Sequence, residues 1–242
     1  MGDNTRTKRN HQTLDADKIA ETIELLSQRI RERFPESGLY QLSLRLHSIS
    51  QDAKRDAHAI ASPIWALRAG IGLLILLIAA GIFVAIRSIA AMEIDFGFNE
   101  LIQTLEAGIN DIVFIGIAIF FLTTLETRIK RDRTLKALHE LRSIAHIIDM
   151  HQLTKDPDQL LEGQEDRAAR HGLDMFSMNR YLDYCTELLS LTGKVGALYV
   201  QEFNDEVALA SVNEIESLTT GLSQKIWQKI MILDTIIQQK ES

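Results

Sequence analysis

Four polar residues between positions 139 and 149 are the part of this sequence best suited to chemistry. His139, Arg142, His146 and Asp149 follow one another at intervals of three, four and three residues, so in an α-helix they share one side. Asp149 lies within one helical turn of His146, where a carboxylate can orient an imidazole and fix its tautomer. These four residues form the polar stripe, which is a candidate for acid–base catalysis or for a response to pH.

The histidines of this region are poorly spaced for a metal ion. Helices that bind zinc usually present two histidines at positions i and i+4, whereas His146 and His151 are five residues apart. The sequence also contains no Walker loop, dinucleotide fingerprint, nucleophile elbow or EF-hand loop. We therefore expect no metal, no cofactor and no catalytic residue, and we interpret the polar stripe first as a solvated helix face with i,i+3 and i,i+4 pairs.

A second group of candidate residues is acidic and lies in and just after the connector between two apolar runs. It comprises five carboxylates: Glu93, Asp95, Glu100, Glu106 and Asp111. In an oligomer they can form a ring that attracts cations, as in a small ion channel, although the potassium-filter sequence TVGYG is absent. The simpler interpretation, which we favour, is that these charges face outward because of membrane topology.

The elements that position both groups are the two apolar runs. Residues 69–86 contain no charged side chain, and together with residues 64–67 they are long enough for a hydrocarbon core of about 30 Å. Arg68 lies one turn inside this run and can extend to the lipid headgroups. The second uncharged run, 112–125, reaches bilayer length when it is extended to 107–127. We predict transmembrane helices over 64–86 and 107–127.

The basic residues predict the orientation of these spans. Five of them follow the second run: Arg128, Lys130, Arg131, Arg133 and Lys136. Four more precede or begin the first run: Arg45, Lys54, Arg55 and Arg68. The outer connector, 87–106, has a single basic residue, Arg87, and we expect it to contain a short helix capped by Asn99. The positive-inside rule then places both termini in the cytoplasm, in what we expect to be a bacterial inner membrane.

The remaining segments are polar or amphipathic. Residues 1–13 are a basic tail that we expect to be disordered, and 14–62 form a hairpin of two amphipathic helices. We expect 128–153 to continue the second span as a cytoplasmic helix, 154–176 to be a polar linker, and 177–242 to form a helical hairpin with coiled-coil-like spacing. The apolar positions that share one side of these helices are Ile19, Ile23, Leu26, Ile30 and Phe34 in the first, Leu39, Leu42, Leu46, Ile49 and Ala53 in the second, Leu138, Leu141, Ile144, Ala145 and Ile148 in 128–153, and Val207, Ile215, Leu218, Leu222, Ile226, Ile230, Leu233 and Ile237 in the last. No segment alternates with a period of two residues, so the predicted fold is an all-α membrane protein.

These features favour an assembly function. With a net charge of −7 the chain lacks the basic balance of a nucleic-acid-binding protein. Amphipathic helices need partners, so we predict a two-pass protein whose cytoplasmic bundle is a scaffolding surface, in a homo-oligomer or with an unknown cytoplasmic protein. The alternatives are a small channel or pH-responsive sensor, and an enzyme that uses His146 with Asp149.

Overall fold

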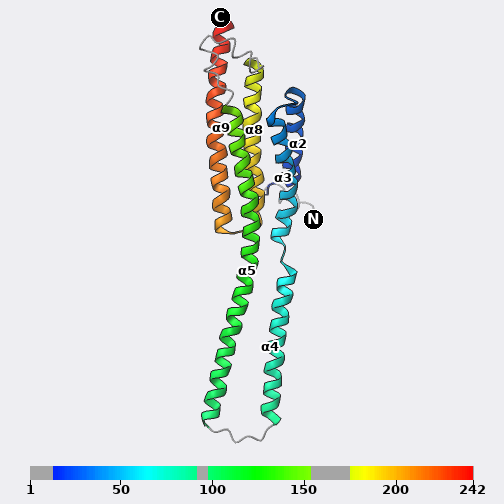
Figure 1. Cartoon of the computed structure of the whole chain (residues 1–242), viewed down its shortest axis with the longest axis vertical. Helices are drawn as coiled ribbons and strands as arrows, with labels where there is room; N and C mark the ends of the chain where they lie inside the picture. The colour runs from blue at the N-terminus through cyan, green and yellow to red at the C-terminus, as the bar shows by residue number, and fades with distance from the viewer. Residues whose placement is uncertain (1–12, 92–97, 154–174, 242) are drawn as a thin grey trace, which may run out of the picture. The chain divides into compact units, whose positions relative to one another are not determined.

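In a computed structural model of the whole chain, residues 13–91, 98–153 and 175–241 are described, and all their regular elements are α-helices (Figure 1). These helices are α2 (Ala16–Arg33), α3 (Gly38–Ala61), α4 (Trp65–Ala91), α5 (Phe98–Leu153), α8 (Met175–Val200) and α9 (Glu206–Glu241). The all-α prediction is confirmed. The predicted basic tail lies outside the described residues except for Thr13. The predicted linker lies outside them except for its last two residues.

The chain divides into two compact units. One, the helical bundle, is formed by Met1–Ala61 and Arg133–Ser242, and the other, the apolar unit, by Ser62–Asp132. Helix α5 is 56 residues long and contributes to both units. We expected a separate short helix in the connector, but its residues form the first turns of α5. Gly108, which follows these residues in α5, costs only about 1 kcal/mol in a helix and does not interrupt it.

Local side-chain contacts explain how the first two helices begin and end. The Asp15 carboxylate caps α2 by accepting hydrogen bonds from the backbone N–H groups of Asp17 (3.0 Å) and Lys18 (3.3 Å). Pro35 stops this helix because it lacks an N–H donor and its ring excludes a helical conformation for the residue before it. Ser37 then donates to the Phe34 carbonyl (2.8 Å) and accepts from the Tyr40 N–H (3.2 Å), which starts α3.

The core of the helical bundle follows the spacing of apolar residues in the sequence. The predicted faces of α2, α3 and α5 are buried: Ile19, Ile23, Leu26, Ile30, Leu39, Leu42, Leu46, Ile49, Ala53, Leu138, Leu141, Ile144, Ala145 and Ile148. Helix α8 is central, since it packs against α9, α3 and α2, and it buries residues on most of its circumference. On α9 one prediction was wrong: Val207 is 44% exposed, because Ala208 and Val212, which lie seven and three residues before the buried Ile215 and so share its side of the helix, face the core instead.

The apolar unit contrasts with this core. Its two helices include Trp65–Val84 in α4 and a segment of α5 that begins at Gly108, and both are long and apolar enough to cross a membrane. Their large side chains face outward, among them Leu76 (64% exposed), Phe114 (71%) and Phe120 (72%). The most apolar stretch of each helix contains no buried residue, so these helices do not resemble the core helices of a soluble domain.

We expect Leu188→Ala to lower the free energy of unfolding of the bundle by about 2–5 kcal/mol, because Leu188 is fully buried and truncation leaves a cavity. Leu25→Ala is the matched control, since this leucine is 54% exposed, and it should change stability by no more than about 0.5 kcal/mol. Urea unfolding of the full chain in detergent, followed by Trp227 fluorescence in a Trp65→Phe background, measures both. Equal losses in the two variants would contradict the observed core.

Candidate functional site

The structure separates the members of the polar stripe into different local contacts. All four lie on α5, with His139 and His146 exposed. Arg142 donates through Nη2 to the carboxylate of Glu214 on α9. Asp149 accepts a hydrogen bond from Gln152 Nε2 at 2.7 Å. Asp149 is not hydrogen-bonded to His146, so the geometry that an acid–base pair requires is not formed.

The stripe nevertheless borders a small hollow between α5 and α9. It has a volume of about 210 Å³ and is lined by Leu135, Leu138, His139, Arg142, Ser211 and Ile215. His139 is the one titratable group there without a salt-bridge partner in the described part of the chain. Among the described residues no group of three or more His, Cys, Asp or Glu side chains is placed to hold a metal ion. The catalytic and pH-sensing interpretations of the stripe stay predictions.

The acidic residues of the connector are mostly outside what the structure describes. Glu93 and Asp95 lie outside the described residues, and of Glu100 and Asp111 only the backbone, in α5, is described. Glu106 is exposed. The proposed ring of carboxylates therefore stays a prediction.

A third arrangement, a cluster of charges around Glu126 in the apolar unit, was not predicted from the sequence. One carboxylate oxygen, Oε1, accepts from Lys130 Nζ (3.0 Å) and from the Ile64 backbone N–H (3.3 Å), and Oε2 lies 3.8 Å from Arg68 Nε. Glu126 and Lys130 are only 14% and 13% exposed. Since Ile64 directly precedes α4, this carboxylate ties the start of α4 to α5. The available signal was two opposite charges, Arg68 and Glu126, each at the end of an apolar run.

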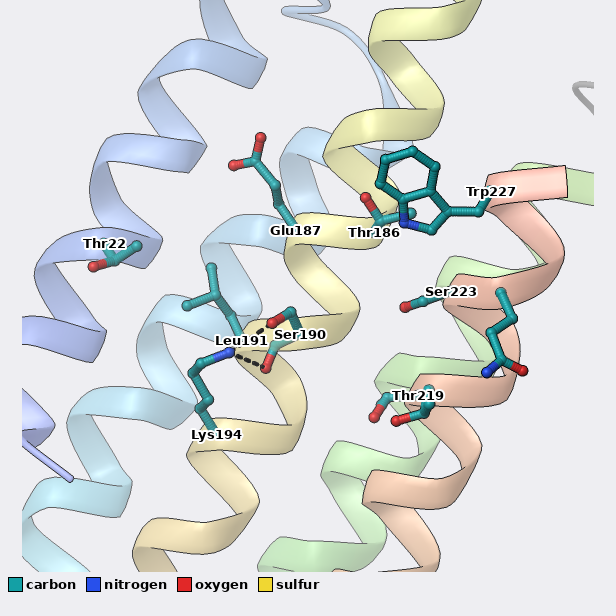
Figure 2. A pocket seen from close by; sticks show the side chains of 11 residues that line it. Thr22, Thr186, Glu187, Ser190, Leu191, Lys194, Thr219, Ser223 and Trp227 are labelled. Atoms are coloured by element: carbon teal, nitrogen blue, oxygen red, sulfur yellow. Dashed lines mark hydrogen bonds between the residues drawn. The ribbon is translucent and has the colours of Figure 1, made fainter. Parts of the chain in front are cut away.

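A second hollow of the helical bundle lies between α2 and α9, and residues of α8 form its base (Figure 2). We call it the hydroxyl groove. Its volume is about 660 Å³, and it is lined by Thr22, Thr186, Glu187, Ser190, Leu191, Lys194, Thr219, Thr220, Ser223, Gln224 and Trp227. Because these residues come from three different helices, α2, α8 and α9, periodicity within one segment cannot reveal them. The hydroxyl groove was therefore not predicted from the sequence.

The chemistry of the hydroxyl groove suits binding. Three threonines donate their only hydroxyl proton to their own helix: Thr22 to the Lys18 carbonyl (2.6 Å), Thr186 to Asp183 (2.8 Å) and Thr219 to Glu216 (3.1 Å). Their oxygens therefore offer only acceptor lone pairs to the groove. Lys194 donates to Ser190 Oγ at 2.6 Å, and the Trp227 side chain is 57% exposed (Figure 2). No lining side chain is a histidine, a cysteine or an activated nucleophile.

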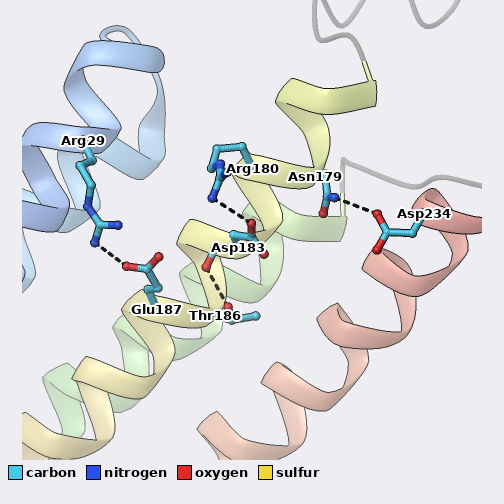
Figure 3. A network of polar contacts seen from close by, with 7 residues as sticks. All are labelled: Arg29, Asn179, Arg180, Asp183, Thr186, Glu187 and Asp234. Atoms are coloured by element: carbon cyan, nitrogen blue, oxygen red, sulfur yellow. Dashed lines mark hydrogen bonds and ion pairs between the residues drawn. The ribbon is translucent and has the colours of Figure 1, made fainter. Parts of the chain in front are cut away.

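A network of polar contacts along α8 aligns the helices beside this groove (Figure 3). Glu187 accepts from Arg29 of α2 at 2.6 Å, Asn179 donates to Asp234 of α9 at 3.0 Å, and Asp183 lies 3.4 Å from Arg180. Partial burial raises the pKa of the Asp183 carboxyl, against the opposing effect of the Arg180 guanidinium. The nearby carboxylates of Glu187 and Asp234 raise it further.

The single cysteine of the chain is part of the core. Cys185 on α8 is fully buried, and burial raises the pKa of its thiol to about 12. Because the thiolate is the nucleophilic form, a buried thiol of this kind is inert at neutral pH. Cys185 is therefore a packing residue of the bundle.

Comparison with known proteins identifies no relative of this chain. No protein-family model matches the chain, and no curated protein or solved structure is similar to it. What the chain does is inferred from its own residues.

We expect the stability of the bundle to fall as the pH rises through the titration of Asp183. Its folded-state pKa lies above the unfolded value of about 3.9, so the folded state holds more protons, and stability decreases from that pH upward. In Asp183→Asn this decrease should shrink by a small but measurable amount, since the carboxylate is partly solvated.

Urea unfolding between pH 3.5 and 6.5, monitored by Trp227 fluorescence in a Trp65→Phe background, tests this dependence. Glu24→Gln, on the exposed face of α2, is the control and should keep the slope of the parent protein. A parent protein whose stability rises throughout this range, with Asp183→Asn identical to it, would refute the assignment.

Proposed function

We propose that this chain is a two-pass membrane protein whose helical bundle, on the cytoplasmic face, is an assembly surface. The observation that carries the proposal is the outward apolar surface of α4 and the first half of α5, from Trp65 (75% exposed) to Phe120 (72% exposed). Soluble proteins rarely leave apolar patches of more than a few hundred Å² in contact with water. A bilayer removes this surface from water without the need for any further partner.

The charges support one orientation. Exposed Arg128 and Arg133 follow the apolar part of α5, and Arg68 begins α4, whereas Arg87 is the one basic residue of the outer connector. The positive-inside rule then favours both termini in the cytoplasm of a bacterial cell. In this orientation the bundle is cytoplasmic.

The assembly role is supported by the hydroxyl groove. It offers acceptor oxygens, an ammonium group and an exposed indole, which are groups that bind, and it lacks an acid–base pair. Exposed apolar residues flank it, with Leu25 on α2 (54% exposed) and Met231 on α9 (66% exposed). We propose a second copy of this chain as its partner, since confinement to one membrane raises the effective concentration of copies.

Reporter fusions test the topology. An alkaline phosphatase fused after residue 97 should be active, and one fused after residue 242 should be inactive, with the opposite pattern for a cytoplasmic fluorescent reporter. If the same reporter were active at both positions, the proposal of two membrane crossings would be refuted. As a further control, Leu76→Lys should impair insertion, because a lysine at the centre of a span costs about 2.5–3.5 kcal/mol.

Mass measurement in detergent tests the assembly. We expect particles larger than one chain of 27.3 kDa, and we expect Ser223→Arg to shift them toward monomers, because a guanidinium then occupies the hydroxyl groove. Asn213→Arg is the matched control on the same helix, since this exposed residue does not line the groove, and it should leave the mass unchanged. A wild-type protein that is monomeric at all concentrations would remove the basis of the assembly proposal.

A further inference from the structure

Cations outnumber carboxylates where α4 begins and where the apolar part of α5 ends. Within the apolar unit these ends carry Arg68, Arg128, Lys130 and Arg131 against Glu126 and Asp132. The balance of four cations against two carboxylates leaves a local charge of +2. The contacts of Glu126 decide which cations face outward.

Glu126 forms a close ion pair with Lys130 and a longer one with Arg68. The ammonium of Lys130 is 3.0 Å from Glu126 Oε1, and its side chain is 13% exposed, so the charge of Lys130 is paired within the protein. Arg68 approaches Glu126 through Nε alone, at 3.8 Å, and its side chain is 57% exposed. The described part of the chain offers Arg68 no other ion-pair partner, so the two terminal amino groups of its guanidinium are available.

Two further residues of the apolar unit, Arg128 on α5 and Trp65 on α4, are also exposed. Arg128 is exposed and has no ion-pair partner among the described residues. Trp65 is 75% exposed and lies three residues before Arg68, on the same side of α4. A tryptophan beside an arginine at the end of an apolar helix is typical of the depth at which lipid headgroups lie.

We propose that Arg68, with Trp65 beside it on α4, binds the phosphate groups of anionic phospholipids. Arg128 lies two residues from Glu126, so it points away from Arg68 and contributes only positive charge to the same end of the apolar unit. This inference rests on the proposed membrane insertion of α4 and α5. A guanidinium binds phosphate through two parallel hydrogen bonds, and the free terminal amino groups of Arg68 fit this mode. A zwitterionic lipid carries the same phosphate, but its ammonium group offsets the charge, so the local charge of +2 selects lipids with net negative charge.

Trp65 itself is the probe that tests this surface. The chain has two tryptophans, so Trp227→Phe leaves Trp65 as the only indole. Reconstituted in vesicles of phosphatidylglycerol and phosphatidylcholine, one or the other brominated, this protein reports by fluorescence quenching which lipid lies beside Trp65. We expect an enrichment of phosphatidylglycerol of about fivefold, which is the effect of roughly one cation at the surface.

Substitution of the arginines should reduce the enrichment of phosphatidylglycerol. Arg68→Gln should bring the enrichment close to one, and molar salt should do so in the parent protein. Arg87→Gln is the matched control, because Arg87 is an exposed arginine at the other end of α4, and it should leave the enrichment unchanged. Arg128→Gln breaks no ion pair or hydrogen bond of the described residues, so it should leave the fold intact and lower the enrichment by less than Arg68→Gln does.

Three outcomes overturn the inference. Equal quenching by both lipids in the parent protein refutes the binding surface while the membrane insertion of α4 stands. An enrichment that survives Arg68→Gln and Arg128→Gln together refutes the role of these arginines. An absence of quenching by either lipid refutes insertion at Trp65, and with it both this inference and the proposed function.

Discussion

The structure depends on the continuity of one helix, α5. Its 56 residues form a single backbone hydrogen-bond ladder, although its two halves have opposite requirements for their surroundings. The first half exposes apolar side chains such as Phe114 and Phe120, whereas the second half buries Leu138, Leu141 and Ile148 in the bundle core. A helix satisfies its backbone groups in either solvent, so it is the element that can pass from one environment to the other without a break.

Ion pairs between the helices of the bundle contribute little to its stability. Arg29 with Glu187, Arg45 with Glu140 and Arg142 with Glu214 each join two different helices, and all six side chains are substantially exposed. Exposed pairs of this kind contribute about 0–1 kcal/mol each. The apolar cluster supplies the stability, and the charge pairs favour one axial offset of the helices over others. Glu126 has a different environment, since it and Lys130 are largely shielded from water.

Prediction from sequence succeeded where the controlling interactions are local. The spacing of Ile19, Ile23, Leu26 and Ile30 was enough to place the buried face of α2, because the period of a helix is a property of the segment itself. It failed at Val207, since the first turn of α9 offers two adjacent apolar residues, Val207 and Ala208, and only Ala208 is buried. Which of the two faces inward depends on how α9 packs against α8, and the apolar spacing within α9 does not contain that packing.

The sequence by itself determined that this is an all-α chain with two long apolar helices and an excess of basic residues at one end of them. These are properties of length, period and composition, which each segment carries alone. Only the tertiary structure decided that Arg142 pairs with Glu214, 72 residues away, and that Asp149 binds Gln152 instead of His146. The same holds for the hydroxyl groove, whose walls come from α2 and α9. Such pairings depend on the rotation and axial offset of packed helices, which are set by the whole core at once.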